Sequence, residues 1–192
     1  MMKSAIFSLM LLSFSLNAFS QDTKKKTPLL KLLIAAGLEL GGDKIAEVYF
    51  TNGEKQSVRA GQGGAVGIGG EFSIPGATAF ALRSTVGIKY VTTAADDRHI
   101  RLTRIPIIVT ANYRPNNKWR LAAGLSTHRN IQFKTDGLGS DYKLQPASGP
   151  VFEVAYAGLG LSFTGMKYKD QLNQTYNANA FGLSYSMTIP AR

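Results

Sequence analysis

Residues 30–40 read LKLLIAAGLEL, a stretch in which two kinds of side chain alternate. One row is entirely apolar, and the row between holds small or charged residues, with Leu33 as the exception. A period of two indicates a β-strand, because successive side chains of a strand point to opposite faces. A tilted strand needs roughly 9–11 residues to cross a membrane. The stretch therefore predicts a strand with one apolar face and the length of a membrane crossing.

The same double row returns seven more times. These crossings are predicted at residues 61–74, 80–90, 104–113, 119–128, 152–157, 159–164 and 181–189. Together they predict an all-β fold for residues 29–192, namely an eight-stranded antiparallel up-and-down transmembrane β-barrel with a narrow, side-chain-filled lumen.

The N-terminus carries an export pattern. Lys3 precedes an apolar run from Ala5 to Leu16, and the small residues Ala18 and Ser20 stand just before Gln21. This order predicts a secretory signal peptide over residues 1–20, followed by a basic periplasmic tail over residues 21–28. The apolar run is short for a membrane helix, which makes an uncleaved anchor the weaker alternative.

Composition limits the partners that we expect. The 192-residue chain has a formal net charge of +10, two histidines and no cysteine. Export argues against a nucleic-acid partner, so the basic charge points to outer-membrane lipid and lipopolysaccharide instead. Disulfides and thiolate metal sites are excluded, and no metal-ligand or nucleotide motif occurs. We expect a monomer with no metal and no cofactor.

The connections between crossings differ in length. Three are short: Pro75-Gly76, residues 114–118 and the turn around Gly158. Residues 44–59 form a long connection that contains the hairpin signal Asn52-Gly53, and residues 129–148 form another. Outer-membrane barrels have short periplasmic turns and longer outer loops, so both termini are expected in the periplasm. We predict a projecting hairpin at 44–59, a loop with strand extensions at 129–148, and a bulge or weakly paired position at Pro106.

Alternation alone does not decide which row faces outward. A soluble lipocalin-like barrel that binds an apolar ligand would turn the apolar row inward. That row is too bulky for an eight-stranded interior, whereas the Gly, Ala, Ser and Thr of the other row suit a crowded lumen. Aromatic residues near the ends of the crossings are then expected at the membrane interfaces. They are Phe72, Phe80, Tyr90, Tyr113, Trp119, Tyr156 and Tyr168.

With these patterns the chain resembles the small eight-stranded outer-membrane barrels of Gram-negative bacteria. The resemblance covers about residues 29–189. It rests on residues 38–64, Arg104-Ile105-Pro106-Ile107, residues 119–125, and a closing strand with Gly182, Tyr185 and Met187. The run from Gly41-Gly42-Asp43 through Asn52-Gly53 to Ala60-Gly61 is similar to a family of uncharacterised envelope proteins.

The resemblance implies an outer-membrane location and a structural or surface-interaction role with an unknown extracellular partner. It implies insertion by the barrel-assembly machinery and no catalytic activity. One departure concerns the C-terminus. Such chains often end on Phe, whereas this one continues through Pro190-Ala191-Arg192.

One set of residues suggests a different function. Some barrels of this size modify lipid A, which requires a nucleophilic serine, a histidine base and an acid. Ser126 and His128 share a strand face, and Glu153 lies in the matching row of a neighbouring strand. Their order is the reverse of that in the deacylases, so a histidine hydrogen-bonded within the lumen is favoured. A lipid A-modifying enzyme remains the alternative.

The charged residues of the small row are expected to pair inside the lumen, because enclosed charges are costly unless paired. They are Lys31, Glu39, Glu71, Arg83, Lys89, Arg104, Arg120 and Glu153. A narrow anion path is the functional alternative, since cations outnumber acids in this set.

Overall fold

The computed structural model of the chain describes residues 28–49, 55–95, 98–135, 137 and 141–190. The expected signal peptide, the basic tail up to residue 27 and the Asn52-Gly53 turn lie outside these residues. Within the described ranges, no helix is long and apolar enough to cross a membrane.

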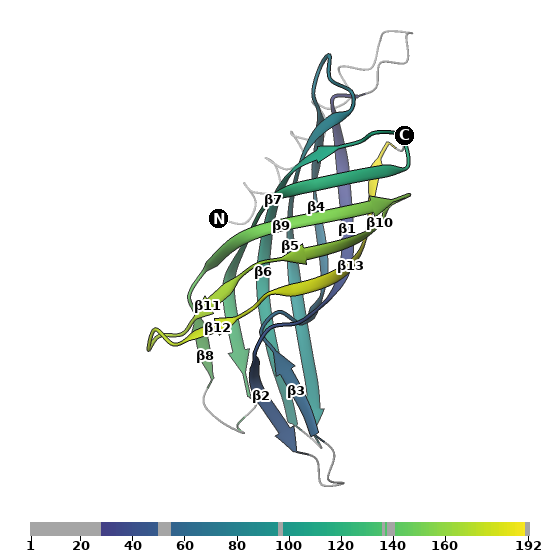
Figure 1. Cartoon of the computed structure of the whole chain (residues 1–192). Coiled ribbons are helices and arrows are strands. Elements are labelled where there is room, and N and C mark those ends of the chain that lie inside the picture. The colour runs from purple at the N-terminus through teal and green to yellow at the C-terminus, as the bar shows by residue number, and fades with distance from the viewer. Residues whose placement is uncertain (1–27, 50–54, 96–97, 136, 138–140, 191–192) are drawn as a thin grey trace, which may run out of the picture.

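Eight strands close into a barrel (Figure 1). They are β1 (Leu30–Leu40), β4 (Gly63–Ser73), β5 (Phe80–Ala95), β6 (Arg98–Tyr113), β7 (Trp119–Lys134), β9 (Ala147–Tyr156), β10 (Leu159–Thr164) and β13 (Ala180–Ile189). Each pairs antiparallel with its neighbours in the order β6-β5-β4-β1-β13-β10-β9-β7, and pairing of β6 with β7 closes the ring. The predicted fold class is confirmed.

The inner row of the wall is packed too tightly for larger residues at several points. A Cβ atom built on Gly69 would lie 1.8 Å from the carbonyl oxygen of Ser84 on β5, and one on Gly124 would lie 2.0 Å from that of Val109 on β6. Small residues therefore let neighbouring strands approach each other while the charged side chains fill the lumen.

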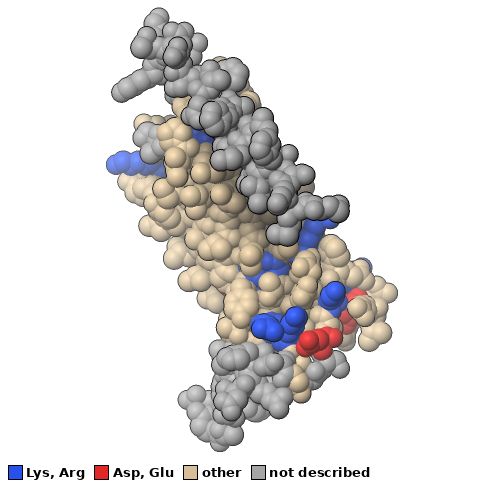
Figure 2. All heavy atoms as spheres, turned by 180° about the vertical axis from the view of Figure 1, so that it is seen from behind, with Lys and Arg blue, Asp and Glu red and all other residues tan. Residues whose placement is uncertain are grey.

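The outer row of the wall is apolar and exposed. Leu38 is 66% exposed, Leu161 70% and Phe181 72%. Seen from behind, the middle of the molecule is a broad wall without charge, and most visible charged side chains lie toward the lower end, where β2 and β3 are found (Figure 2). The apolar row thus faces outward, opposite to the arrangement of a lipocalin-like barrel.

Beyond this wall, the same strands continue with their polarity reversed. On β5 the inward residue after Lys89 is Val91, and on β6 the inward residue before Arg104 is Leu102. The inside of this outer part, which we call the cap, is therefore apolar. Its buried core consists of Val58, Ala60, Val91, Ile100, Leu102, Ile131, Phe133, Leu144, Ala147, Met166, Tyr168 and Ala178.

Short strands complete the cap. A hairpin of β2 (Lys44–Tyr49) and β3 (Lys55–Arg59) projects from the lower end, β8 (Tyr142–Leu144) pairs with β7, and β11 (Lys167–Lys169) pairs with β12 (Thr175–Asn177) (Figure 1). The predicted hairpin is confirmed by its strand pairing. The strand extensions predicted within the loop at 129–148 are present as the end of β7, as β8 and as the start of β9. The polar stretch after Thr92 is also in large part strand, because β5 and β6 extend into the cap.

The irregularity predicted at Pro106 is present. The ladder between β5 and β6 skips Ile105 and Pro106, as expected for a residue that cannot donate a hydrogen bond. A register shift between β6 and β7 follows at Thr103–Ile105, opposite Asn130, which has φ 49°. The bulge shifts β7 by one residue, so that Ile131 and Phe133 turn inward into the cap core.

Candidate functional site

At the end of the lumen near the short turns, one carboxylate joins two arginines. Glu71 is fully buried and accepts hydrogen bonds from Arg83 Nε (2.7 Å) and Arg114 Nη1 (2.6 Å). Arg83 also donates to Ser186 Oγ (3.1 Å). Lys31, itself buried, lies opposite Glu71 in the register of β1 and β4. Sequence reasoning missed Arg114, because it falls in a turn and reaches back into the lumen.

A second ion pair continues this network across the barrel. Arg120 on β7 pairs with Glu153 on β9 and donates to Asn112 Oδ1 (3.1 Å) and Ser186 Oγ (3.3 Å). Ser184 donates to the other Glu153 oxygen (3.3 Å). Ser186 thus accepts hydrogen bonds from both Arg83 and Arg120, and links the two ion pairs.

At the cap end of the lumen, the cations are held by backbone carbonyls as well as by a carboxylate. Lys89 pairs with Glu39 and donates to the carbonyl oxygen of Gly61 (2.7 Å). Arg104 is fully buried and donates to the carbonyl oxygens of Ala60 and Gln62. The chain turns here through Gly63, where φ is 151° and a Cβ would lie 2.9 Å from Arg104 Nη2. Glycine suits this position because side-chain-bearing residues rarely adopt this φ angle, and because a Cβ would crowd the Arg104 guanidinium that the neighbouring backbone carbonyls bind.

Tyr168 joins this cluster from the cap. Its hydroxyl accepts a hydrogen bond from Arg104 Nη1 (3.2 Å) and lies 2.5 Å from His128 Nδ1. Burial raises the pKa of the Tyr168 phenol above its ordinary value, so the phenol keeps the proton that it can donate to His128. The predicted interface position of Tyr168 is wrong. Alternation continues past Gly165 and directs Met166 and Tyr168 inward, where the cap is apolar.

The Ser126, His128 and Glu153 of the enzyme alternative are not assembled into a triad. Glu153 pairs in register with Ala122, whereas Ser126 pairs with Gly149 and His128 with Ala147. Four residues of strand separate the levels of Glu153 and Ser126, about 13 Å. Glu153 is bound to Arg120, and His128 Nδ1 is bound to Tyr168 instead of an acid. Within the described residues, no acidic or histidine cluster could hold a metal ion.

The other predicted interface aromatics lie on the outer wall. Phe72, Phe80, Tyr113, Trp119 and Tyr156 are exposed toward the short turns, and Tyr90 is exposed toward the cap. Two pairs pack together in the ring at the short-turn end, Phe80 with Tyr113 (ring centroids 5.2 Å apart) and Trp119 with Tyr156 (5.1 Å). Phe163 and Phe181 form a further pair nearer the cap (5.1 Å), which the sequence analysis did not single out.

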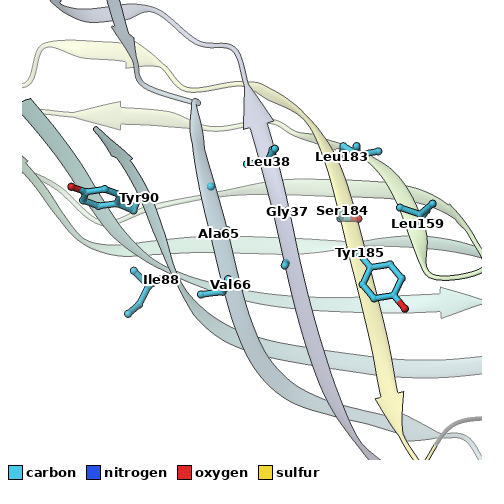
Figure 3. Close-up of a pocket in the computed structure, with 12 residues that line it drawn as sticks. Gly37, Leu38, Ala65, Val66, Ile88, Tyr90, Leu159, Leu183, Ser184 and Tyr185 are labelled. Atoms are coloured by element: carbon cyan, nitrogen blue, oxygen red, sulfur yellow. The ribbon is translucent and has the colours of Figure 1, made fainter. Parts of the chain in front are cut away.

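The outer wall has a shallow groove of about 490 Å³ over β1, β4, β5, β10 and β13 (Figure 3). It arises because Ala36 and Gly64 leave space between larger outward neighbours such as Leu38, Val66 and Tyr90. Its lining is almost wholly apolar, which suits contact with hydrocarbon and not with water.

The chain matches no protein-family model and no curated protein. Among solved structures, it is similar to Ail, the attachment invasion locus protein of Yersinia pestis, in complex with the heparin analogue sucrose octasulfate (8% identity, 82% of this chain and 97% of Ail, TM-score 0.42). It is also similar to Neisserial surface protein A (14% identity, 83% of this chain and 95% of that one, TM-score 0.45).

Proposed function

We propose that the chain is an integral outer-membrane barrel that presents a folded cap to the outside and acts in surface interaction. The observation that carries this proposal is the reversal of polarity along continuous strands. In the barrel, apolar side chains face outward and charges face inward; in the cap, apolar side chains face inward and charges outward. Such a reversal is expected where a strand passes from hydrocarbon into water.

The features of the cap favour interaction over transport. Its apolar core adjoins the lumen cations Lys89 and Arg104, and Tyr168 of that core accepts a hydrogen bond from Arg104. The lumen below contains paired, hydrogen-bonded side chains, and eight strands leave little interior space. An open ion path would have to cross both layers. The cap's outward positions include exposed charged residues such as Arg129, Lys143 and Lys169, which a partner can reach.

Catalysis is disfavoured by the separation of the candidate residues. A nucleophilic serine needs a base within about 2.6–3.2 Å, and that base needs an orienting group. His128 shares its Nδ1 with Tyr168, and the only acid proposed for it is bound elsewhere. We therefore infer a role without acyl transfer at this site.

Membrane fractionation tests the proposal. The protein should be found with the outer membrane, resist extraction without detergent, and migrate differently on electrophoresis when unboiled and boiled. Because the chain has no cysteine, single-cysteine variants then test orientation. A membrane-impermeant maleimide added to whole cells should label Lys143→Cys in the cap, and should not label Lys118→Cys at the short-turn end. Recovery in the soluble fraction, or the reverse labelling, would contradict the proposal.

A further inference from the structure

Four exposed cations gather on one side of the cap, on β7, β8 and β11, and we call them the cation patch: Arg129, Lys143, Lys167 and Lys169. β8 pairs with β7, where Lys143 lies opposite Gln132. Gln145, just after β8, donates its backbone N–H to the carbonyl oxygen of Lys169 (2.8 Å), which ties β11 to the same surface. The strands that bear the patch lie together at the lower left of Figure 1.

Two described acidic residues, Asp141 and Asp170, lie in the chain segments that carry the cation patch. Within the described residues, none of its four side chains forms a salt bridge. The nearby acids are engaged by the backbone. Asp141 accepts a hydrogen bond from Thr135 N (2.9 Å), and Asp170 accepts from Leu172 N and Gln174 N (both 2.8 Å). Both carboxylates keep their negative charge, but the four cations outnumber these two acids, so the patch presents a local excess of positive charge to an external anion.

The position of the patch indicates what kind of anion it binds. On β7, Arg129 follows Leu125, which is 62% exposed, by four residues on the same outward row. Lys167, the first residue of β11, likewise lies four residues after Phe163 of β10. These intervals are about 13 Å along a strand. Long cationic side chains bridge part of that distance by lying along apolar surface.

Two hydroxyl groups lie at the border between the patch and the apolar wall. Thr127 on β7 and Ser148 on β9 share a hydrogen bond (2.9 Å). Whichever hydroxyl accepts this bond keeps its own proton free for another acceptor. The border thus offers hydrogen-bond donors below the cations, where the oxygens of an anionic headgroup would lie.

We propose that the cation patch binds the phosphate groups of an anionic lipid of the outer leaflet, with the lipid's acyl chains against the apolar wall below. An amphiphile fits because one surface supplies both cations and hydrocarbon contact, whereas a soluble polyanion would use the cations alone. This inference rests on the proposed membrane location and specifies one partner of the cap.

The test uses the full mature chain refolded in detergent micelles, with bis-phosphorylated lipid A and its phosphate-free counterpart as probes. Lipid binding is measured by native mass spectrometry at several salt concentrations. The Lys167→Gln/Lys169→Gln variant should bind bis-phosphorylated lipid A about 25-fold more weakly, because each cation near an anionic surface contributes about a fivefold factor. The loss should shrink as salt rises, and the phosphate-free lipid should bind both proteins equally weakly.

The matched control is Lys44→Gln/Lys118→Gln, which removes the same charge from exposed positions outside the patch. Equal weakening by the control, unchanged binding by the patch variant, or equal binding of both lipids would overturn the proposal. So would loss of binding to soluble heparin with unchanged binding to lipid A, because the partner would then be a soluble polyanion. The heat-dependent mobility of every sample reports barrel folding separately, so failure of the lipid site is distinguishable from failure of the proposed function.

Discussion

Arg104 and Tyr168, which are 64 residues apart in the chain, share a hydrogen bond of 3.2 Å where the lumen meets the core of the cap. The arginine belongs to the polar interior of the barrel, and the tyrosine ring belongs to the apolar interior of the cap. This contact joins two environments of opposite polarity inside one closed sheet.

Replacing Tyr168 with Phe should weaken this junction. The substitution leaves the ring in place but removes the hydrogen-bond partner of Arg104 and His128, both of which are buried. The free energy of unfolding should fall by about 1–3 kcal/mol. Urea titration in lipid vesicles, followed by the fluorescence of Trp119, measures it. Tyr176→Phe is the control, because that hydroxyl bonds to the exposed Gln174, and should cost about 0.5 kcal/mol or less.

Replacing Glu71 with Gln should be more damaging. The change leaves Arg83 and Arg114 in the lumen without the carboxylate that both contact. Loss of one partner of a buried ion pair costs about 3–5 kcal/mol, and the same urea titration should detect it. The exposed pair of Lys44 and Glu47 (3.4 Å) provides the comparison. Glu47→Gln should change stability by less than about 1 kcal/mol, and equal losses would contradict a special role for Glu71.

Two glycines of β4 should respond oppositely to Leu. At Gly64, on the outer wall, a Cβ would lie at ordinary contact distance from Leu38 Cδ2 (3.5 Å) and Tyr90 O (4.0 Å), so Leu should fill the groove of Figure 3 and leave refolding intact. At Gly69, on the inner row, a Cβ would meet Ser84 O at 1.8 Å, so Leu should prevent barrel closure. The heat-modifiable fraction after refolding measures both. Normal refolding of Gly69→Leu would show that β4 and β5 can move apart.

The cap should lose stability in strong alkali. Burial raises the pKa of Tyr142 on β8 to about 12, with Tyr176 and Asp170 adding to the rise. An ordinary tyrosine titrates near 10, so folding favours the neutral phenol, and the stabilisation is present below pH 10 and lost as the pH rises to about 12. The ultraviolet absorbance of tyrosinate should lose one late-titrating group in Tyr142→Phe, whereas Tyr168 and Tyr176, whose pKa values are also raised, should still titrate late. An unchanged titration curve in that variant would contradict this assignment.

Overproduction of the chain should leave the mass spectrum of lipid A unchanged. The expectation follows from the register, which separates Glu153 from Ser126 and His128. A new lipid A species that disappears with both Ser126→Ala and His128→Ala would establish the enzyme alternative instead.

Much of the barrel could be predicted because its rules are local. Alternation of side chains shows, within a few residues, where a strand lies and which face each side chain takes. Leu30–Leu40 is an example, because both predicted bounds agree with β1. Short connections indicate that consecutive strands pair antiparallel, which predicts an up-and-down topology. Ion pairing in the lumen was expected because charges recur on the inward row, and the structure pairs Arg83 with Glu71, Lys89 with Glu39 and Arg120 with Glu153.

The cap could not be predicted in the same way. In the barrel the inward row holds small or charged residues, so an apolar residue such as Tyr or Ile on that row looks like a break in the alternation. It is recognised as regular only when the segment is known to lie in the cap, where the interior is apolar. The pattern therefore places Tyr168 on the wrong surface, and it does not indicate that β5 and β6 continue past Thr92 into the cap. Arg114 was missed because a turn residue can reach the lumen only once the turn is placed.

The sequence by itself determined the strands, their two faces and the charge hidden between them, because these depend on a period of two that any strand must follow. Tertiary structure decided where the polarity reverses, which carboxylate meets which cation, and that Arg104 is held by backbone carbonyls and a tyrosine from β11. Those outcomes depend on register between strands distant in the chain, and on whether hydrocarbon or water is expected outside each part of the wall.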